Sequence, residues 1–227
     1  MRIKICGLTQ IDQAVAIATT DVSVLGFICV QQSPRYITPE TISTISKALP
    51  AIDRFGVFAN TSIEDIQHTV ITGQLSGVQL HGNESPAFCQ QVHSALPTVE
   101  LIKAIRIRQS QDLAQINDYI PHIDTLLLDA YHPEQLGGTG QSLDWKTLQT
   151  FAPQKPWFLA GGLRPDNIQQ ALSLLSPDGI DLSSGVENSP GDKNLEKVDQ
   201  LLKNVQLVMN SQGSTNDLLQ QAHNHQP

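Results

Sequence analysis

The chain has 227 residues, of which 40% are hydrophobic and 16% charged, and its formal net charge is −8 at pH 7. This size and hydrophobic content suit one large globular domain or two small ones. An acidic chain without a Lys/Arg-rich run argues against nucleic acid or an anionic membrane surface as the main partner.

Compartment and redox state follow from the same composition. The opening residues, MRIKICGLTQ, are too short and too polar for a secretory signal, and no apolar run approaches the length of a membrane span. The three cysteines, Cys6, Cys29 and Cys89, lack the paired spacing of a disulfide framework or a zinc site. We therefore expect a cytoplasmic protein with reduced thiols.

Eight short apolar runs alternate with amphipathic stretches, which is the pattern of parallel strands joined by crossover helices. The expected strands are 3–6, 22–28, 54–59, 76–80, 99–105, 124–130, 156–160 and 178–183. The expected helices are 11–20, 39–49, 62–71, 85–96, 110–119, 143–151, 164–175 and 194–209. Eight such pairs predict an α/β fold, a closed (β/α)8 TIM barrel, whose usual size is about 250 residues.

Several of these helices open with a capping residue or with a proline in the first turn. The expected caps are Thr9, Thr38, Thr61 and Asn83, and the prolines are Pro39 and Pro165. No Pro/Gly/Ser-rich linker divides the series, so residues 1–207 are expected to form a single barrel domain. Residues 208–227 are polar and rich in Gln and Asn, and we expect them to be a poorly ordered tail.

Polar side chains collect at the carboxyl ends of the predicted strands, where the active site of a barrel lies. The first strand ends at Cys6 with Lys4 on the same face, and the sixth ends at Asp129 after three leucines. Cys6 is either a small core residue or a thiol placed to do chemistry. Desolvation at an apolar strand end favours the protonated form of Asp129, which indicates a general acid.

Other strand ends carry residues with several possible roles. Arg35 is a solvated loop arginine or the bidentate partner of a ligand carboxylate. Gln79 and His81 end the fourth strand, and His81 is a ligand, an acid/base group or a structural hydrogen-bond donor. Asp181 shares a face of the eighth strand with Ser183, and no second histidine at a matching strand end supports a metal site.

The loops after the last two strands predict a phosphate site. Gly161 and Gly162 allow backbone N–H groups to approach an anion, and a helix expected near Arg164 directs its positive end to the same point. Ser183, Ser184 and Gly185 form the second half of the cradle, with a short extra helix over SGVEN. A chain of negative net charge thereby binds an anion locally.

With these strand ends assembled, the chain resembles the phosphoribosylanthranilate isomerase family, barrel enzymes of tryptophan biosynthesis. The matching segments are, in order, KICGLT, SPRYI, GVFAN, VQLHG, LLLDA, GGTG with LDW, LAGGLRPDN and GIDLSSGVENSPGDKN. An ordered set over residues 1–207 is more specific than any single motif, and the tail lies outside it.

The resemblance implies roles for individual residues. Cys6 is expected to be the general base, Asp129 the general acid, and Arg35 the group that binds the substrate carboxylate. Lys4, Gln79, His81 and Asp181 are expected to contact the substrate. The expected phosphate-binding residues are Gly138, Thr139, Gly140, Gly161, Gly162, Ser183, Ser184 and Gly185. Gln141 stands where many relatives carry a lysine.

The implied reaction is the Amadori rearrangement of N-(5-phosphoribosyl)anthranilate to 1-(2-carboxyphenylamino)-1-deoxyribulose 5-phosphate. Asp129 protonates the ribose ring oxygen, and the Cys6 thiolate removes the C2 proton of the resulting Schiff base. A free thiol has a pKa of about 8.5, so Lys4 or the helix start near Thr9 must favour the thiolate. We expect no cofactor, a small phosphosugar as ligand, and a monomer or homodimer.

Three other functions fit parts of the pattern. A ribulose-phosphate epimerase needs a His/Asp metal set, and an indole-glycerol-phosphate synthase needs a catalytic lysine with further carboxylates. Neither set is visible in the sequence. A phosphosugar-binding barrel without catalysis would keep the phosphate loops, but it would not need both Cys6 and Asp129.

Overall fold

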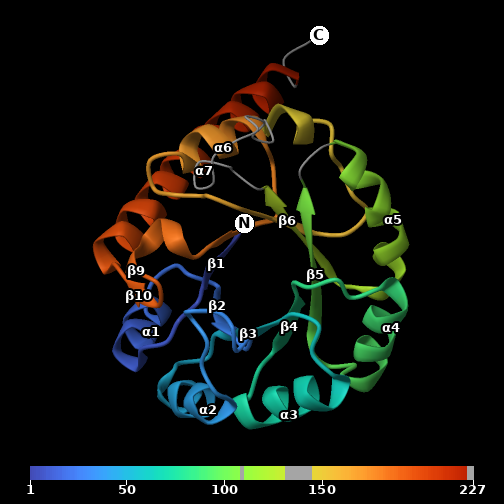
Figure 1. The fold of residues 1–227 in the computed structure, drawn as a ribbon. Coiled ribbons are helices and arrows are strands. Elements are labelled where there is room, and N and C mark those ends of the chain that lie inside the picture. Colours follow the sequence, from blue (N-terminus) through green and yellow to red (C-terminus); the bar gives the residue numbers. More distant parts are fainter. Residues whose placement is uncertain (108–109, 131–144, 224–227) are drawn as a thin grey trace, which may run out of the picture.

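The computed structural model describes residues 1–107, 110–130 and 145–223. Eight parallel strands close into one barrel in chain order, and the helices surround it (Figure 1). The strands are β1 (Arg2–Cys6), β2 (Val24–Ile28), β3 (Asp53–Phe58), β4 (Gly77–Leu80), β5 (Glu100–Ile107), β6 (Thr125–Ala130), β7 (Trp157–Ala160) and β8 (Gly179–Leu182). The predicted (β/α)8 barrel is confirmed.

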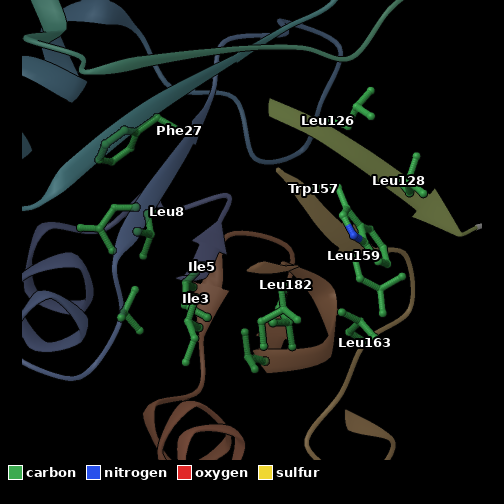
Figure 2. Packing of buried hydrophobic residues seen from close by; sticks show 14 of the residues in the cluster. Ile3, Ile5, Leu8, Phe27, Leu126, Leu128, Trp157, Leu159, Leu163 and Leu182 are labelled. Carbon is green, nitrogen blue, oxygen red and sulfur yellow. The ribbon is translucent and has the colours of Figure 1, made fainter. Parts of the chain in front are cut away.

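Alternation along the strands separates two apolar layers. Outward-facing side chains such as Ile3, Ile5 and Leu159 pack toward the helices in the larger core, as Figure 2 shows. A smaller cluster fills the inside of the barrel. Its members are Val24, Phe55, Ile102, Ala104, Leu127, Phe158 and Ala160. The barrel interior is therefore a packed core, and ligands can enter only at its ends.

The helices of the first half of the chain are close to those predicted. They are α1 (Ile11–Ala18), α2 (Pro39–Ala48), α3 (Ile63–Gly73) and α4 (Pro86–Ala95). Thr38 caps α2 by accepting a hydrogen bond from the backbone N–H of Thr41, and Pro39 lies in the first turn. Both of these features were predicted.

Three predicted caps are wrong. The cap of α3 is Ser62 and that of α4 is Ser85, each accepting a hydrogen bond from the backbone three residues on, so neither Thr61 nor Asn83 has this role. Thr9 does not cap α1, because its hydroxyl donates to the carbonyl of Gly191. Where several polar residues precede a helix, the geometry of the loop selects the one that caps.

The connections after β5, β6 and β7 contain less α-helix than predicted. The segment after β5 is a 3₁₀ helix (Ser110–Gln115), the short α5 (Ile116–Tyr119) and a second 3₁₀ turn (Ile120–His122). In the described part of the connection after β6 there is a 3₁₀ helix, Trp145–Leu148. Helix α6 is Ile168–Leu174, so Pro165 lies in the turn before it.

The chain after β8 begins with the predicted extra helix, a 3₁₀ turn at Ser184–Val186. A small antiparallel pair follows, β9 (Glu187–Ser189) and β10 (Asp192–Lys193), and then α7 (Leu195–His223). The last part of α7 extends beyond the ring of helices (Figure 1). Domain limits of 1–207 and 208–227, and a poorly ordered tail, stay predictions. No helix in the described residues has the length and apolar character of a membrane span.

The amino end of the barrel is closed by Arg2. Its guanidinium donates to both carboxylate oxygens of Glu100 at 2.8 and 2.9 Å and contacts Asp53 at 3.1 Å. It also lies 5.5 Å from the ring centre of Phe55 and 5.4 Å from that of Phe158. These contacts stabilise the amino end of the barrel. The candidate site lies at the opposite end, where the strands have their carboxyl termini.

Candidate active site

A buried ion pair lies directly beneath Cys6. Lys4 is completely buried, and its Nζ is 3.0 Å from each carboxylate oxygen of Asp181. Residues Lys4 and Asp181 are paired in register between β1 and β8, so the pair joins the first and last strands. Both were predicted to contact the substrate, and in the structure they bind each other.

Gly26 makes room for the thiol. Cys6 and Gly26 are register partners on β1 and β2. A Cβ at Gly26 would lie 2.8 Å from the Cys6 sulfur, which is too close, and 3.0 Å from the Lys4 nitrogen, which would have to shift slightly. The missing side chain therefore allows the sulfur and the ammonium group to approach the same point.

The electrostatic surroundings of Cys6 differ from the sequence-based expectation. Burial is the largest influence and raises the pKa of the Cys6 thiol, although the charge of Lys4 acts to lower it. Burial alone would lower the pKa of Lys4, but Asp181 and Cys6 hold it above its usual value. Burial, to which the charge of Asp181 adds, therefore outweighs the effect of Lys4 and favours the protonated thiol of Cys6 in the absence of substrate.

Among the described residues, no lysine donates a hydrogen bond to either of the other two thiols, although the charge of Lys103 acts to lower the pKa of Cys89. Burial raises the pKa of Cys29 to about 12 and that of Cys89 to about 11. Cys29 contacts the backbone of β2, and Cys89 lies in the core on α4. Among the three cysteines, Cys6 is distinguished by the lysine that hydrogen-bonds to it.

Asp129, near the end of β6, belongs to a hydrogen-bonded series of three polar side chains. Its Oδ2 is 3.3 Å from Nε2 of His81, and Nδ1 of His81 is 3.0 Å from Nε2 of Gln79. Asp129 and His81 are each about one quarter exposed, whereas Gln79 is buried. Asp129 thus keeps contact with the mouth of the barrel, and its desolvation is less complete than the apolar strand suggested.

By rotating, the Gln79 amide lets this hydrogen-bonded series accommodate either protonation state of Asp129. When the Gln79 amide nitrogen donates to Nδ1 of His81, the imidazole carries its proton on Nε2 and donates to the Asp129 carboxylate. A half-turn of the amide makes its oxygen the acceptor of an Nδ1 proton, and Nε2 then accepts from a carboxylic acid. The buried Oε1 of Gln79 has no hydrogen-bond partner in the described structure, which leaves that half-turn unopposed.

The two predicted phosphate loops have the backbone that such a site needs. Gly161 and Gly162 have φ values of 90° and 65°, a region that favours glycine. A Cβ at Gly185 would lie within van der Waals overlap of the Leu163 carbonyl oxygen, so the two loops meet backbone to backbone. The helix expected at Arg164 is instead a turn, and α6 begins four residues later.

Asn167 fixes the conformation of that turn. Its side-chain oxygen accepts from the backbone N–H of Arg164 at 2.8 Å, and its side-chain nitrogen donates to the Gly162 carbonyl at 2.9 Å. The Asn167 side chain therefore ties the Gly162 carbonyl and the Arg164 N–H together within the turn.

Arg35 makes a bidentate contact with a carboxylate, but the carboxylate is that of Glu187 in the same chain. Its Nε is 2.9 Å and its Nη2 is 2.6 Å from oxygens of Glu187. Glu187 also binds Nζ of Lys193 at 2.7 Å. Burial opposes ionisation of Glu187, yet Arg35 and Lys193 hold its pKa below the usual value. A substrate-binding role of Arg35 stays a prediction.

This network lies beside the phosphate loops and was missed by sequence reasoning. Lys193 approaches the Ser183 backbone oxygen at 3.4 Å, and a Cβ at Gly7 would meet both the Arg35 side chain and the Ser183 hydroxyl. Two cations and one carboxylate leave a net positive charge near Ser183. The Arg35 side chain is therefore close to Ser183, one of the predicted phosphate-binding residues.

Some expectations fall on residues for which no structure is described. Gly138, Thr139, Gly140 and Gln141 lie outside the described residues. In the parts of the chain that are described, no three His, Cys, Asp or Glu side chains form a group that could hold a metal ion.

Comparison with known proteins agrees with this geometry. The family model for N-(5'-phosphoribosyl)anthranilate (PRA) isomerase matches residues 3–204. An N-(5'-phosphoribosyl)anthranilate isomerase of Acaryochloris marina is 58% identical over 216 residues, covering 92% of this chain and 100% of that protein. The enzyme of the same name from Nostoc punctiforme is also 58% identical, over 90% of this chain and 98% of its own.

Solved structures give the same relationship. Phosphoribosylanthranilate isomerase from Thermotoga maritima is 33% identical with a TM-score of 0.82, over 91% of this chain and 98% of that chain. A second structure, of such an isomerase in complex with reduced 1-(o-carboxyphenylamino)-1-deoxyribulose 5-phosphate, is 31% identical with a TM-score of 0.80, over the same shares of the two chains. With a family match over most of its length and relatives of this identity, the chain belongs to the N-(5'-phosphoribosyl)anthranilate isomerase family.

Proposed function

We propose that this chain converts N-(5-phosphoribosyl)anthranilate into 1-(2-carboxyphenylamino)-1-deoxyribulose 5-phosphate in tryptophan biosynthesis, with Asp129 as general acid and Cys6 as general base. Family membership supports the reaction, and a solved relative binds a reduced form of this product. One observation carries the assignment of roles. In the closed barrel, the phosphate loops after β7 and β8 stand between the strands that end in Asp129 and Cys6.

Ring opening is the first step. Protonated Asp129 gives its proton to the ribose ring oxygen, the bond from this oxygen to C1 breaks, and a Schiff base forms between C1 and the anthranilate nitrogen. The His81 ring beside Asp129 and the Gln79 amide support this role, because together they accommodate the acid before the transfer and the carboxylate after it.

Proton removal is the second step. The Cys6 thiolate takes the proton from C2, and the electron pair of the broken bond forms the C1–C2 double bond while the Schiff-base nitrogen becomes a neutral amine. The resulting enolamine tautomerises to the ketone. The Lys4 ammonium supports Cys6 as the base, since its charge stabilises the thiolate during the reaction.

The phosphate of the substrate binds between the β7 and β8 loops. Gly161 and Gly162 present backbone N–H groups without side chains, and Ser183, Ser184 and Gly185 complete the cradle. Lys193 beside Ser183 adds positive charge at this point. The substrate therefore extends from these loops toward Cys6 and Asp129.

The test of the function is an assay of the purified chain for loss of phosphoribosylanthranilate fluorescence. We expect turnover without added cofactor. Binding of the phosphosugar without turnover would contradict the isomerase proposal and favour a non-catalytic barrel. Absence of both binding and turnover in a folded preparation would contradict phosphosugar recognition as well.

Gly162→Val should weaken phosphate binding. A β-branched residue disfavours the positive φ of this position and brings a side chain to the place where the backbone faces the anion. We expect KM for the substrate and Kd for inorganic phosphate to rise about ten-fold or more, the effect of losing charge-assisted hydrogen bonds. Gly162→Ala is the control for backbone strain, and thermal unfolding of both variants separates strain from lost contacts. Unchanged phosphate affinity in the valine variant would mean that the anion binds elsewhere.

A further inference from the structure

Lys103 interrupts the apolar outer face of β5. Leu101 and Ile105, two residues to either side of it, pack in the larger core, and the alternation of side chains along a strand places Lys103 on the same face. Its side chain is buried there although it carries a charge. The register partner of Lys103 is Leu80, the last residue of β4, so its ammonium group lies beside the loop that begins with His81.

The Lys103 ammonium group binds the end of β4 and the loop that follows it. Its Nζ donates to the backbone oxygens of Leu80 at 3.4 Å and of Gly82 at 2.8 Å. It also donates to Oε2 of Glu84 at 2.7 Å, and the Glu84 side chain is buried as well. The residues on either side of His81 are thus held by one ammonium group on β5.

The Glu84 carboxylate binds backbone N–H groups of two loops. Its Oε1 accepts from Asn60, in the loop after β3, at 2.7 Å, and its Oε2 accepts from Gly82 at 2.9 Å. A Cβ at Gly82 would lie 2.6 Å from Oε1 of Glu84, so the carboxylate packs directly on the Gly82 backbone. Burial opposes ionisation of Glu84, but hydrogen bonds from Lys103 and from the Asn60 backbone hold its pKa below the usual value.

His81 is the side chain that this loop places in the mouth of the barrel. Its Nε2 lies 3.3 Å from Oδ2 of Asp129, and its backbone N–H donates to the Phe58 carbonyl at 2.8 Å. The side chain is about one quarter exposed, so core packing does not enclose it. Because a hydrogen bond of this length weakens with a small further displacement, the contact with Asp129 depends on the position of the loop.

We propose that Lys103 and Glu84 are positioning residues that fix the loop after β4 and thereby keep the His81 ring in contact with Asp129, an inference that rests on the proposed function. A buried ion pair is a poor source of net stability, because the desolvation of both ions offsets much of their attraction. Every contact described here for the two side chains instead fixes the geometry of one loop. Both act through His81, so their loss should affect kcat more than the binding of a substrate whose phosphate lies at β7 and β8.

The inference is tested with three variants of the pair and one control. Lys103→Met removes the donor, Glu84→Leu removes the acceptor, and Glu84→Gln keeps one oxygen that can accept from the same backbone N–H groups. The control is Arg2→Met, which breaks an ion pair at the amino end of the barrel. Thermal unfolding measures the stability of each variant, and the fluorescence assay measures kcat and KM.

A spectroscopic measurement reports the contact itself. The nitrogen-15 signals of the His81 ring are identified by their absence in His81→Asn. They are recorded in each variant with and without the additional exchange Asp129→Asn, which should shift them wherever the ring and the carboxyl group are in contact. This response does not depend on turnover.

Lys103→Met and Glu84→Leu should lower kcat by about 10- to 100-fold, the range expected for a displacement of about 1 Å at a reacting group, with little change in KM. The His81 signals of both variants should no longer respond to Asp129→Asn. Glu84→Gln should be intermediate in kcat and in this response. Arg2→Met should be less stable than the wild type, with the wild-type kcat and the wild-type response.

Wild-type kcat in Lys103→Met and Glu84→Leu would overturn the inference, as would a preserved His81 response in these variants. An equal loss of kcat in Arg2→Met would overturn it too, because the loss would then follow stability. If the first two variants do not fold, wild-type kcat and response in Glu84→Gln would have the same meaning. Absence of turnover in the wild type would contradict the proposed function, whereas the His81 response would still decide whether the pair positions the ring.

Discussion

Cys6→Ser should fold like the wild type and lose about 10²- to 10⁴-fold in kcat, the usual contribution of a positioned base. A hydroxyl fits the space that Gly26 leaves and still accepts a hydrogen bond from Lys4. It is a far weaker acid than a thiol, so the Lys4 charge does not convert it into an anionic base at accessible pH. Steady-state kinetics by the fluorescence assay gives kcat and KM separately, and we expect KM to change little.

Cys89→Ser is the matched control for this substitution. Cys89 is also buried, but it lies in the core on α4, so the exchange should lower stability and leave kcat unchanged. A pH profile adds a second measurement. Because burial raises the pKa of the Cys6 thiol, kcat/KM of the wild type should increase as the pH rises above neutrality, and this increase should be absent in Cys6→Ser. Near wild-type turnover in Cys6→Ser would make Cys6 a core residue.

Asp129→Asn should reduce kcat by a similar factor, about 10²- to 10⁴-fold, because an amide has no proton of suitable acidity for the ring oxygen. The carboxamide has nearly the same shape, and its oxygen accepts from His81 as the carboxylate does. Substrate binding should therefore persist. Single-turnover measurements with saturating enzyme separate ring opening from binding.

The control for Asp129→Asn is the same exchange at Asp53. This residue pairs with Arg2 at the amino end of the barrel, so Asp53→Asn should affect stability and not the reaction. An Asp129→Asn variant with turnover close to wild type, beside an unaffected Asp53→Asn, would remove Asp129 from the acid role and leave His81 as the nearest candidate.

The barrel itself was predictable because each strand is a short apolar run that neighbouring helices cover on its outer face. The connection after β5 shows the limit of that pattern. Residues 110–119 have helical spacing, yet they form a 3₁₀ segment and a short α5, and Pro121 lies in the turn that follows. How many α-helical turns fit there depends on the path back to β6, which periodicity does not describe.

The thiol and the carboxylate that we propose as base and acid were also visible in the sequence. Cys6 and Asp129 each end an apolar strand, and in a closed parallel barrel all such ends meet at one mouth. The glycines of the phosphate loops were recognisable for a similar reason, since positive φ values at Gly161 and Gly162 leave few alternatives to glycine. These features depend on the position of one residue within its own strand or loop.

The sequence by itself therefore determined the fold, the family and the strand ends at which we propose the chemistry, whereas the tertiary structure decided which charged side chains pair with one another. Lys4 meets Asp181 across 177 positions, and Arg35 meets Glu187 across 152. The first pair forms because the barrel closes β1 onto β8, and the second because β9, which follows β8, brings Glu187 to the loop after β2. Closure of the barrel is a property of the whole chain. A side chain's partners are fixed by the elements that surround it in space and not by its neighbours in sequence.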